Sequence, residues 1–266
     1  MLKRILTSLV LASIGVPAII YGGIFFWLLM AVFVVVASWE YINLMRGADF
    51  QPSMMISVSG VFIIFLMRTY FPTYESAALI GFVFLSMAYH LVAFERGRDR
   101  AAGDFAITIA SLVYMGWIGS YLVKLRELPN GLFWFTLVLP IVWFADSGAY
   151  LIGKKFGKHK LSPRLSPKKT WEGYWGGVLF GVLGSILFAW LWRHNIEISL
   201  LQTILLGLVL SMLTTLGDLG ESMIKRQSGI KDSSHILPGH GGIFDRIDTW
   251  LWAAPIGYYL VRWFFI

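Results

Sequence analysis

The sequence predicts an all-α, polytopic membrane protein that forms one membrane domain. Of its 266 residues, 57% are hydrophobic and only 14% are charged. This balance excludes a disordered chain and disfavours a soluble domain. Nine apolar segments are each close to the roughly 20 residues that a membrane-spanning helix needs. The aromatic share of 16%, with 12 Trp, suits a chain whose rings lie at both membrane interfaces.

The nine segments are expected as helices in the order 5–22, 24–45, 54–70, 77–94, 105–123, 131–152, 173–192, 199–224 and 248–265. The first follows Lys3 and Arg4, and no small-residue cleavage site comes after it, so we expect a retained helix rather than a signal peptide. The division of 5–45 into two helices depends on Tyr21-Gly22-Gly23. One long helix there would leave eight spans.

The basic residues predict the orientation of these helices. With a cytoplasmic N-terminus, 17 Lys and Arg lie on the inner side and 5 on the outer side, as the positive-inside rule requires. The net charge of +7 is therefore taken to reflect the orientation of the helices and contact with anionic lipid or substrate, rather than binding of nucleic acid. The chain has no Cys, which excludes disulfides and thiolate sites. The expected location is a bacterial inner membrane.

Polar residues divide the chain into two parts. Residues 1–130 are expected to form N-terminal transmembrane helices with short connections. Residues 131–266 are expected to form a C-terminal catalytic part with cytoplasmic loops 153–172 and 225–247. Most of the remaining charge, together with much Gly, Pro, Ser and His, falls in 146–172 and 217–248. Function is therefore expected in these two inner-facing stretches.

The first stretch combines lysines with glycines and hydroxyl side chains. Ammonium groups and open backbone N–H groups suit the binding of phosphates. Ser166-Pro167 predicts a helix start, with free N–H groups beside Lys168 and Lys169. The alternative is that these lysines only keep the loop in the cytoplasm. Asp146, near the inner end of a span, is expected to face a cavity or to pair with a nearby Lys.

The second stretch places Asp218, Glu221, Ser222 and Lys225 on one face of a helix, because their spacing is i, i+3, i+4 and i+7. Asp245 and Asp248 follow, one helical turn apart, as the last apolar helix begins. Asp218, Asp245 and Asp248 are expected to offer oxygen ligands to a hard cation such as Mg²⁺. Lys225, Arg226 and Arg246 would then balance phosphate charge. Alternatively, the same carboxylates and cations form ion pairs between helices.

His235 and His240 lie in the polar loop between these residues. The surrounding carboxylates favour hard cations over Zn²⁺, and no His-x-x-x-His spacing is present. Both histidines are therefore expected to form hydrogen bonds or to contact phosphate rather than to bind a metal.

The 27-residue run from Ser222 to Asp248 resembles the signature of the phosphatidate cytidylyltransferases, or CDP-diacylglycerol synthases. It reads Ser222-x-Ile224-Lys225-Arg226, four residues, Lys231-Asp232-x-Ser234, two residues, and Leu237-Pro238-x-His240-Gly241-Gly242-Ile243-x-Asp245-Arg246-Ile247-Asp248. The stretches Asp146…Ala149-Tyr150 and Ser166 to Gly173 are similar to the family too. The resemblance is strong over roughly 140–260; before that, only length and hydropathy agree.

The resemblance implies an integral-membrane enzyme that makes CDP-diacylglycerol and pyrophosphate from CTP and phosphatidic acid, with a divalent metal and a homodimeric assembly. Asp218 and Asp245 would bind metal, with Asp248 close behind. Catalytic roles are thereby expected for Asp218, Lys225, Asp245 and Asp248. Substrate contacts are expected for Asp146, Ser166, Lys168, Lys169, Ser222, Arg226, Lys231, Asp232, His240 and Arg246. The number of Mg²⁺ ions, a monovalent partner ion and the role of Asp232 stay open.

Two other functions compete with this interpretation. A CTP-dependent kinase of a lipid alcohol needs similar phosphate chemistry but transfers the γ-phosphate, so its products differ. A transporter would place Asp146 and Asp218 near mid-membrane between repeat halves. The charges instead crowd the cytoplasmic ends, and no inverted repeat is visible.

Overall fold

The computed structural model describes residues 2–239 and 241–266, without the side chains of residues 2–5. The chain divides into two compact units, Met1–Val123 with Ile224–Ile247, and Lys124–Met223 with Asp248–Ile266. Apart from a two-stranded hairpin and one isolated bridge, the described residues form helices and their connections. The all-α prediction is therefore confirmed.

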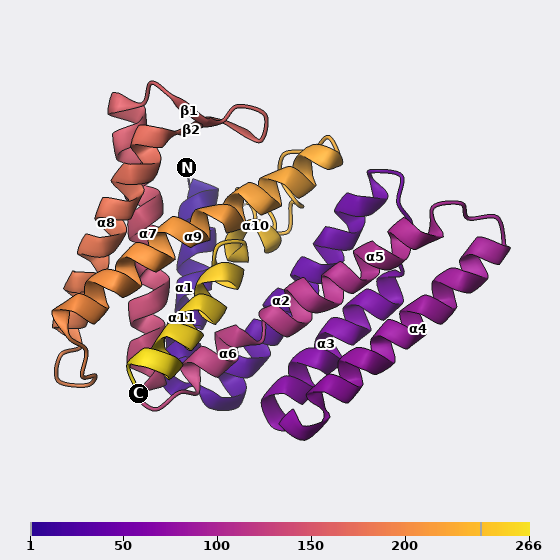
Figure 1. Ribbon diagram of the computed structural model, residues 1–266, viewed down its shortest axis with the longest axis horizontal. Coiled ribbons are helices and arrows are strands. Elements are labelled where there is room, and N and C mark those ends of the chain that lie inside the picture. Colours follow the sequence, from indigo (N-terminus) through magenta and orange to yellow (C-terminus); the bar gives the residue numbers. More distant parts are fainter. Residues whose placement is uncertain (1, 240) are drawn as a thin grey trace. The chain divides into compact units, whose positions relative to one another are not determined.

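The first unit contains α1 (Leu2–Tyr21), α2 (Gly23–Arg46), α3 (Met54–Tyr70), α4 (Glu75–Glu95) and α5 (Ala101–Ser111). The last continues through the π-helical turn η2 (Leu112–Ile118) into the first residues of α6 (Tyr121–Arg126), and the one-turn helix α10 (Phe244–Ile247) packs on α2. In Figure 1, α3, α4 and α5 lie side by side. Gly22 separates α1 from α2 with φ 66° and ψ −149°, a conformation that only glycine adopts readily. The prediction of two helices over 5–45 is thus confirmed.

The second unit contains α7 (Gly131–Phe156), the hairpin strands β1 (Lys160–Ser162) and β2 (Ser166–Thr170), α8 (Trp171–Leu191), α9 (Leu200–Gln227) up to Met223, and α11 (Trp250–Phe264). Figure 1 shows α7 and α8 side by side, joined by the hairpin. β1 and β2 are antiparallel, with Lys160 opposite Thr170 and Ser162 opposite Ser166.

Six helices of the described chain are long and apolar enough to cross a membrane: Gly23–Arg46, Pro72–Glu95, Ala101–Arg126, Gly131–Phe156, Trp171–Leu191 and Leu200–Gln227. The apolar helices Leu6–Tyr21 and Met54–Tyr70 are shorter, and α11 has 15 residues, or about 22 Å of helix against a core of about 30 Å. The protein is therefore a membrane protein. The count of nine spans and the cytoplasmic N-terminus stay predictions.

A close approach of α7 and α8 is made possible by small residues. A Cβ atom on Gly177 would lie 2.8 Å from the Ala145 carbonyl oxygen and 3.1 Å from the Ala149 Cβ. Such contacts let the backbones pack directly against each other, as is common in membrane helices. Because the nearest atom belongs to the backbone of α7, it cannot yield as a flexible side chain would.

Replacing Gly177 by Val is expected to destabilise the protein by about 1–3 kcal/mol, the usual cost of overpacking. Thermal unfolding in detergent measures this loss. Gly81→Val in α4 is the matched control, because nothing lies within 4 Å of its Cβ position. Equal unfolding temperatures for the two variants would contradict a tight α7–α8 contact.

Candidate active site

A group of three carboxylates lies in the second unit. Asp218 and Glu221 come from α9 and Asp248 lies two residues before α11; one oxygen of each lies within 4.8 Å of the others. Gly217 brings α9 close to this segment, since a Cβ there would lie 2.7 Å from the Asp248 carbonyl oxygen. Glu221 and Asp248 are buried and Asp218 is partly exposed. The helical spacing predicted that Glu221 shares a face with Asp218 but did not identify Glu221 as a candidate ligand.

An ammonium group lies at one of the three carboxylates. The Lys169 Nζ is 2.5 Å from the Asp218 Oδ2, and the Ser222 hydroxyl donates a 3.4 Å hydrogen bond to the Asp218 Oδ1. The carboxylate of Asp146 interacts electrostatically with both Asp218 and Lys169. Carboxylate oxygens gathered in this way suit a hard divalent cation such as Mg²⁺.

The β1–β2 hairpin positions the lysines. The prediction that Ser166-Pro167 starts a helix is wrong, because residues 166–170 form β2 and α8 begins only at Trp171. Thr170 is the N-cap of α8, and its Oγ1 accepts a hydrogen bond from the Gly173 N–H, a standard way to begin a helix. In an extended strand neighbouring side chains point to opposite faces, so exposed Lys168 and half-buried Lys169 point in different directions.

Glu172 holds the hairpin against the start of α8. Its carboxylate accepts hydrogen bonds from the backbone N–H groups of Lys158, at 3.0 Å, and His159, at 3.2 Å, and contacts the His159 Nδ1 at 2.6 Å. The carboxylate thus ties the residues just before β1 to the helix that follows β2.

Asp245 is the centre of a hydrogen-bonded network in the first unit. Its Oδ1 lies 2.7 Å from the Lys225 Nζ. Its Oδ2 accepts from the backbone N–H of Ser233 at 3.0 Å, from the Ser233 hydroxyl at 2.9 Å and from the Gly242 N–H at 2.8 Å. The alternative of an ion pair between these carboxylates and cations is therefore present for Lys225 and Asp245. The helix α10 that carries Asp245 ends at Ile247, so Asp245 and Asp248 do not share one regular helix.

Glu40 in α2 holds the same loop and was not predicted. Its fully buried carboxylate accepts from the Ser233 and Ser234 hydroxyls at 3.2 and 2.5 Å, and from the Ile243 and Phe244 N–H groups at 3.0 and 2.6 Å. The Ser233 hydroxyl lies within hydrogen-bond distance of both Glu40 and Asp245. A carboxylate inside an apolar helix is the sequence signal that marks such a residue.

Six of the predicted substrate-contact residues are exposed in the structure: Asp146, Lys168, Arg226, Lys231, Asp232 and Arg246. Ser166 is partly exposed. His240 lies outside the described residues. The structure therefore brings together Asp218, Lys169 and Asp248 in one unit, and Lys225 with Asp245 in the other.

Comparison with known proteins gives matches along nearly the whole chain. Residues 2–264 match the model of the cytidylyltransferase family. A phosphatidate cytidylyltransferase of Pseudomonas aeruginosa is 38% identical over 264 residues, which cover 96% of this chain and 94% of that protein. Proteins of the same name are 32% identical in Staphylococcus saprophyticus, over 95% and 96% of the two chains, and 31% identical in Synechocystis, over 97% and 96%.

Proposed function

This chain belongs to the cytidylyltransferase family of nucleotidyl-transferring enzymes, and we propose that it transfers the cytidylyl group of CTP to phosphatidic acid. The products are CDP-diacylglycerol and pyrophosphate. The observation that carries the proposal is the match of almost the full chain to proteins named phosphatidate cytidylyltransferase. The carboxylates of Asp218, Glu221 and Asp248 within 4.8 Å of one another support it.

In this reaction a phosphate oxygen of the lipid attacks the α-phosphorus of CTP, and the bond from that phosphorus to the oxygen bridging to the β-phosphorus breaks. The lipid phosphate is already anionic near neutral pH, so a general base has little to do. The barrier is the repulsion between two anionic reactants and the charge on the leaving pyrophosphate. Catalysis by positioning and charge stabilisation follows from this, as in phosphoryl transfer generally.

Asp218, Glu221 and Asp248 would hold the divalent cation, which when bound supplies positive charge to the phosphates. Lys169 lies at Asp218, so its ammonium group keeps that carboxylate oriented and adds charge to the same site. Exposed Lys168 is assigned to CTP or lipid phosphate. Asp245 contacts Lys225, Ser233 and Gly242 and thereby orders the parts of the loop around residues 233 and 242. The metal role that the resemblance gives Asp245 stays a prediction.

The location proposed for the enzyme is a bacterial inner membrane, with the reacting residues on the cytoplasmic side and a homodimeric assembly. The concentration of basic residues in the predicted inner loops supports the orientation through the positive-inside rule. On that side CTP arrives from the cytosol while the acyl chains stay in the bilayer.

Purified protein incubated with α-³²P-labelled CTP, phosphatidic acid and Mg²⁺, with and without EDTA, tests the reaction. We expect metal-dependent transfer of label into the organic phase together with release of pyrophosphate. A lipid-alcohol kinase would instead release CDP and leave the α-label in the aqueous phase. Binding of CTP without transfer to phosphatidic acid would refute the proposed acceptor.

Lys168→Ala is expected to raise the KM for CTP or phosphatidic acid about tenfold with a much smaller change in kcat. One charge-assisted contact to phosphate is lost, which is worth about 1.5 kcal/mol. Steady-state kinetics in mixed micelles measure the two constants. Lys160→Ala is the matched control, because Lys160 is an exposed lysine on the paired strand. Unchanged kinetics for Lys168→Ala would show that Lys168 does not contact a substrate phosphate and only helps to keep the loop in the cytoplasm.

A further inference from the structure

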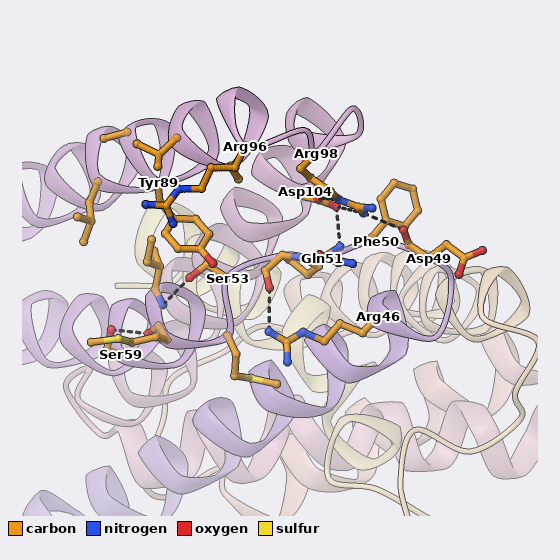
Figure 2. Close-up of a pocket in the computed structure, with 18 residues that line it drawn as sticks. Arg46, Asp49, Phe50, Gln51, Ser53, Ser59, Tyr89, Arg96, Arg98 and Asp104 are labelled. Carbon is orange, nitrogen blue, oxygen red and sulfur yellow. Dashed lines mark hydrogen bonds and ion pairs between the residues drawn. The ribbon is translucent and has the colours of Figure 1, made fainter.

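The first unit contains a cavity of about 1460 Å³ that shares no residue with the acidic group of the second unit. The end of α2, the connection 47–53, the first turns of α3 and the last turns of α4 form its walls. Figure 2 shows arginines on several of these walls. Neither the proposed reaction nor the family signature uses these residues.

One arginine of this cavity belongs to the framework. The Arg98 guanidinium lies 2.7 Å and 3.2 Å from the two oxygens of buried Asp104 and donates to the Asp49 carbonyl oxygen at 2.8 Å. Asp104 also accepts from the Gln51 N–H at 2.7 Å. The hydrogen bond to Asp104 raises the pKa of Arg98. Arg98 and Asp104 therefore fix the connection 49–51 and compensate each other's charge.

Arg46 and Arg96 supply the remaining positive charge. The Arg46 Nη2 donates to the Pro52 carbonyl oxygen at 3.2 Å. The exposed Arg96 guanidinium makes no hydrogen bond or ion pair with any residue in the described part of the chain. In Figure 2 the Asp49 carboxylate points away from both guanidinium groups. Two cationic groups thus line the cavity without a carboxylate partner among the residues that the structure describes.

The rest of the wall is apolar and exposed. Met55 is 82% exposed, Leu85 52%, and Tyr89 and Val92 each 50%. Only 11% of the apolar window of α4 is buried within the chain. Large exposed apolar side chains beside the two cationic groups of Arg46 and Arg96 suit the binding of an amphiphile. A free phosphate would contact only the arginines, and an apolar helix would contact only the apolar wall of the cavity.

We propose that this cavity binds an anionic phospholipid, with its phosphate at Arg46 and Arg96 and one acyl chain along Met55, Leu85, Tyr89 and Val92. Guanidinium groups match phosphate oxygens in charge and in donor geometry. A position at the ends of α2 and α4, next to basic residues, is where a headgroup meets the interface. None of these residues is among those assigned to the reaction.

Native mass spectrometry of the full-length protein in detergent tests the site with dioleoylphosphatidylglycerol as the probe and dioleoylphosphatidylcholine as the zwitterionic reference. The double variant Arg46→Gln/Arg96→Gln is expected to bind the anionic lipid about tenfold more weakly, through loss of charge-assisted contacts. Its affinity for phosphatidylcholine is expected not to change. Ala88→Trp, which fills the apolar wall without removing charge, is expected to weaken the binding of both lipids.

Arg100→Gln is the matched control, because Arg100 is an exposed arginine of the same segment that does not line the cavity. Equal losses for Arg100→Gln and the double variant would overturn the site in favour of diffuse surface charge. Displacement of the lipid by inorganic phosphate at similar concentration would overturn the acyl-chain contact. Unchanged binding in both the double variant and Ala88→Trp would overturn the proposal altogether. The readout is lipid binding, so it does not depend on the proposed reaction.

Discussion

Replacement of Asp218 by Asn is expected to lower turnover by about 10²- to 10³-fold, the usual loss when one electrostatic contact to a transition state is removed. Asp218 shares its surroundings with Glu221 and Asp248, and the amide would remove one negative charge while preserving side-chain size. Affinity for the divalent cation is expected to fall as well. Steady-state kinetics and Mn²⁺ binding followed by electron paramagnetic resonance measure the two effects separately.

The ion pair of Asp218 with Lys169, at 2.5 Å, offers a competing explanation that a double variant separates. If Asp218 acts mainly by holding Lys169, Asp218→Asn/Lys169→Met should be no worse than either single variant. If Asp218 holds the cation, Mn²⁺ binding should be lost in the single and the double variant alike, because both lack its carboxylate. Asp99→Asn, at an exposed position of the first unit, is the charge control. A folded Asp218→Asn protein with near wild-type turnover would contradict the assignment.

Replacement of Glu40 by Ala is expected to release the segment 233–244 and to lower both stability and turnover. Three donors lose their acceptor, the Ser234 hydroxyl and the buried Ile243 and Phe244 N–H groups, while the Ser233 hydroxyl keeps Asp245 as an acceptor. Each buried donor left unsatisfied costs about 1–3 kcal/mol. Thermal unfolding in detergent measures the stability. Trypsin cleavage after exposed Lys231 measures the order of the segment, and we expect it to become faster.

Glu95→Ala is the control for Glu40, because Glu95 is an exposed glutamate at the end of α4. Glu40→Gln distinguishes a positioning role from simple loss of packing. It keeps the volume and one acceptor oxygen, so an intermediate cleavage rate and intermediate turnover are expected. Cleavage and turnover like those of the wild type in Glu40→Ala would show that the segment is ordered without this carboxylate.

The sequence predicted the helices well because an apolar segment has one way to satisfy its backbone in lipid. The predicted segment 54–70 is α3, and 131–152 lies within α7. The β1–β2 hairpin was missed because Ser166-Pro167 is a good local helix start. The pairing of 160–162 with 166–170 and the cap at Thr170 override that local preference.

The sequence predicted most of the residues of the candidate site, but it did not predict which residues those side chains contact. The i, i+3 spacing placed Asp218 and Glu221 on one face, but a helical pattern does not tell a ligand from a neighbour. The role of Glu40 could not be predicted from the sequence for a different reason. Its partner Ser233 lies 193 residues further along the chain, and no local spacing reports a contact over such a separation.

The same separation has a consequence for how the chain is made. At about 5–20 residues per second, ribosomes take roughly 10–40 s to reach Ser233 after they have synthesised Glu40. During that interval the hydrogen-bond donors of the Glu40 carboxylate have not yet been synthesised. The packing of α2 against the segments that carry Ser233, Ser234, Ile243 and Phe244 is therefore completed only after the C-terminal part of the chain is made.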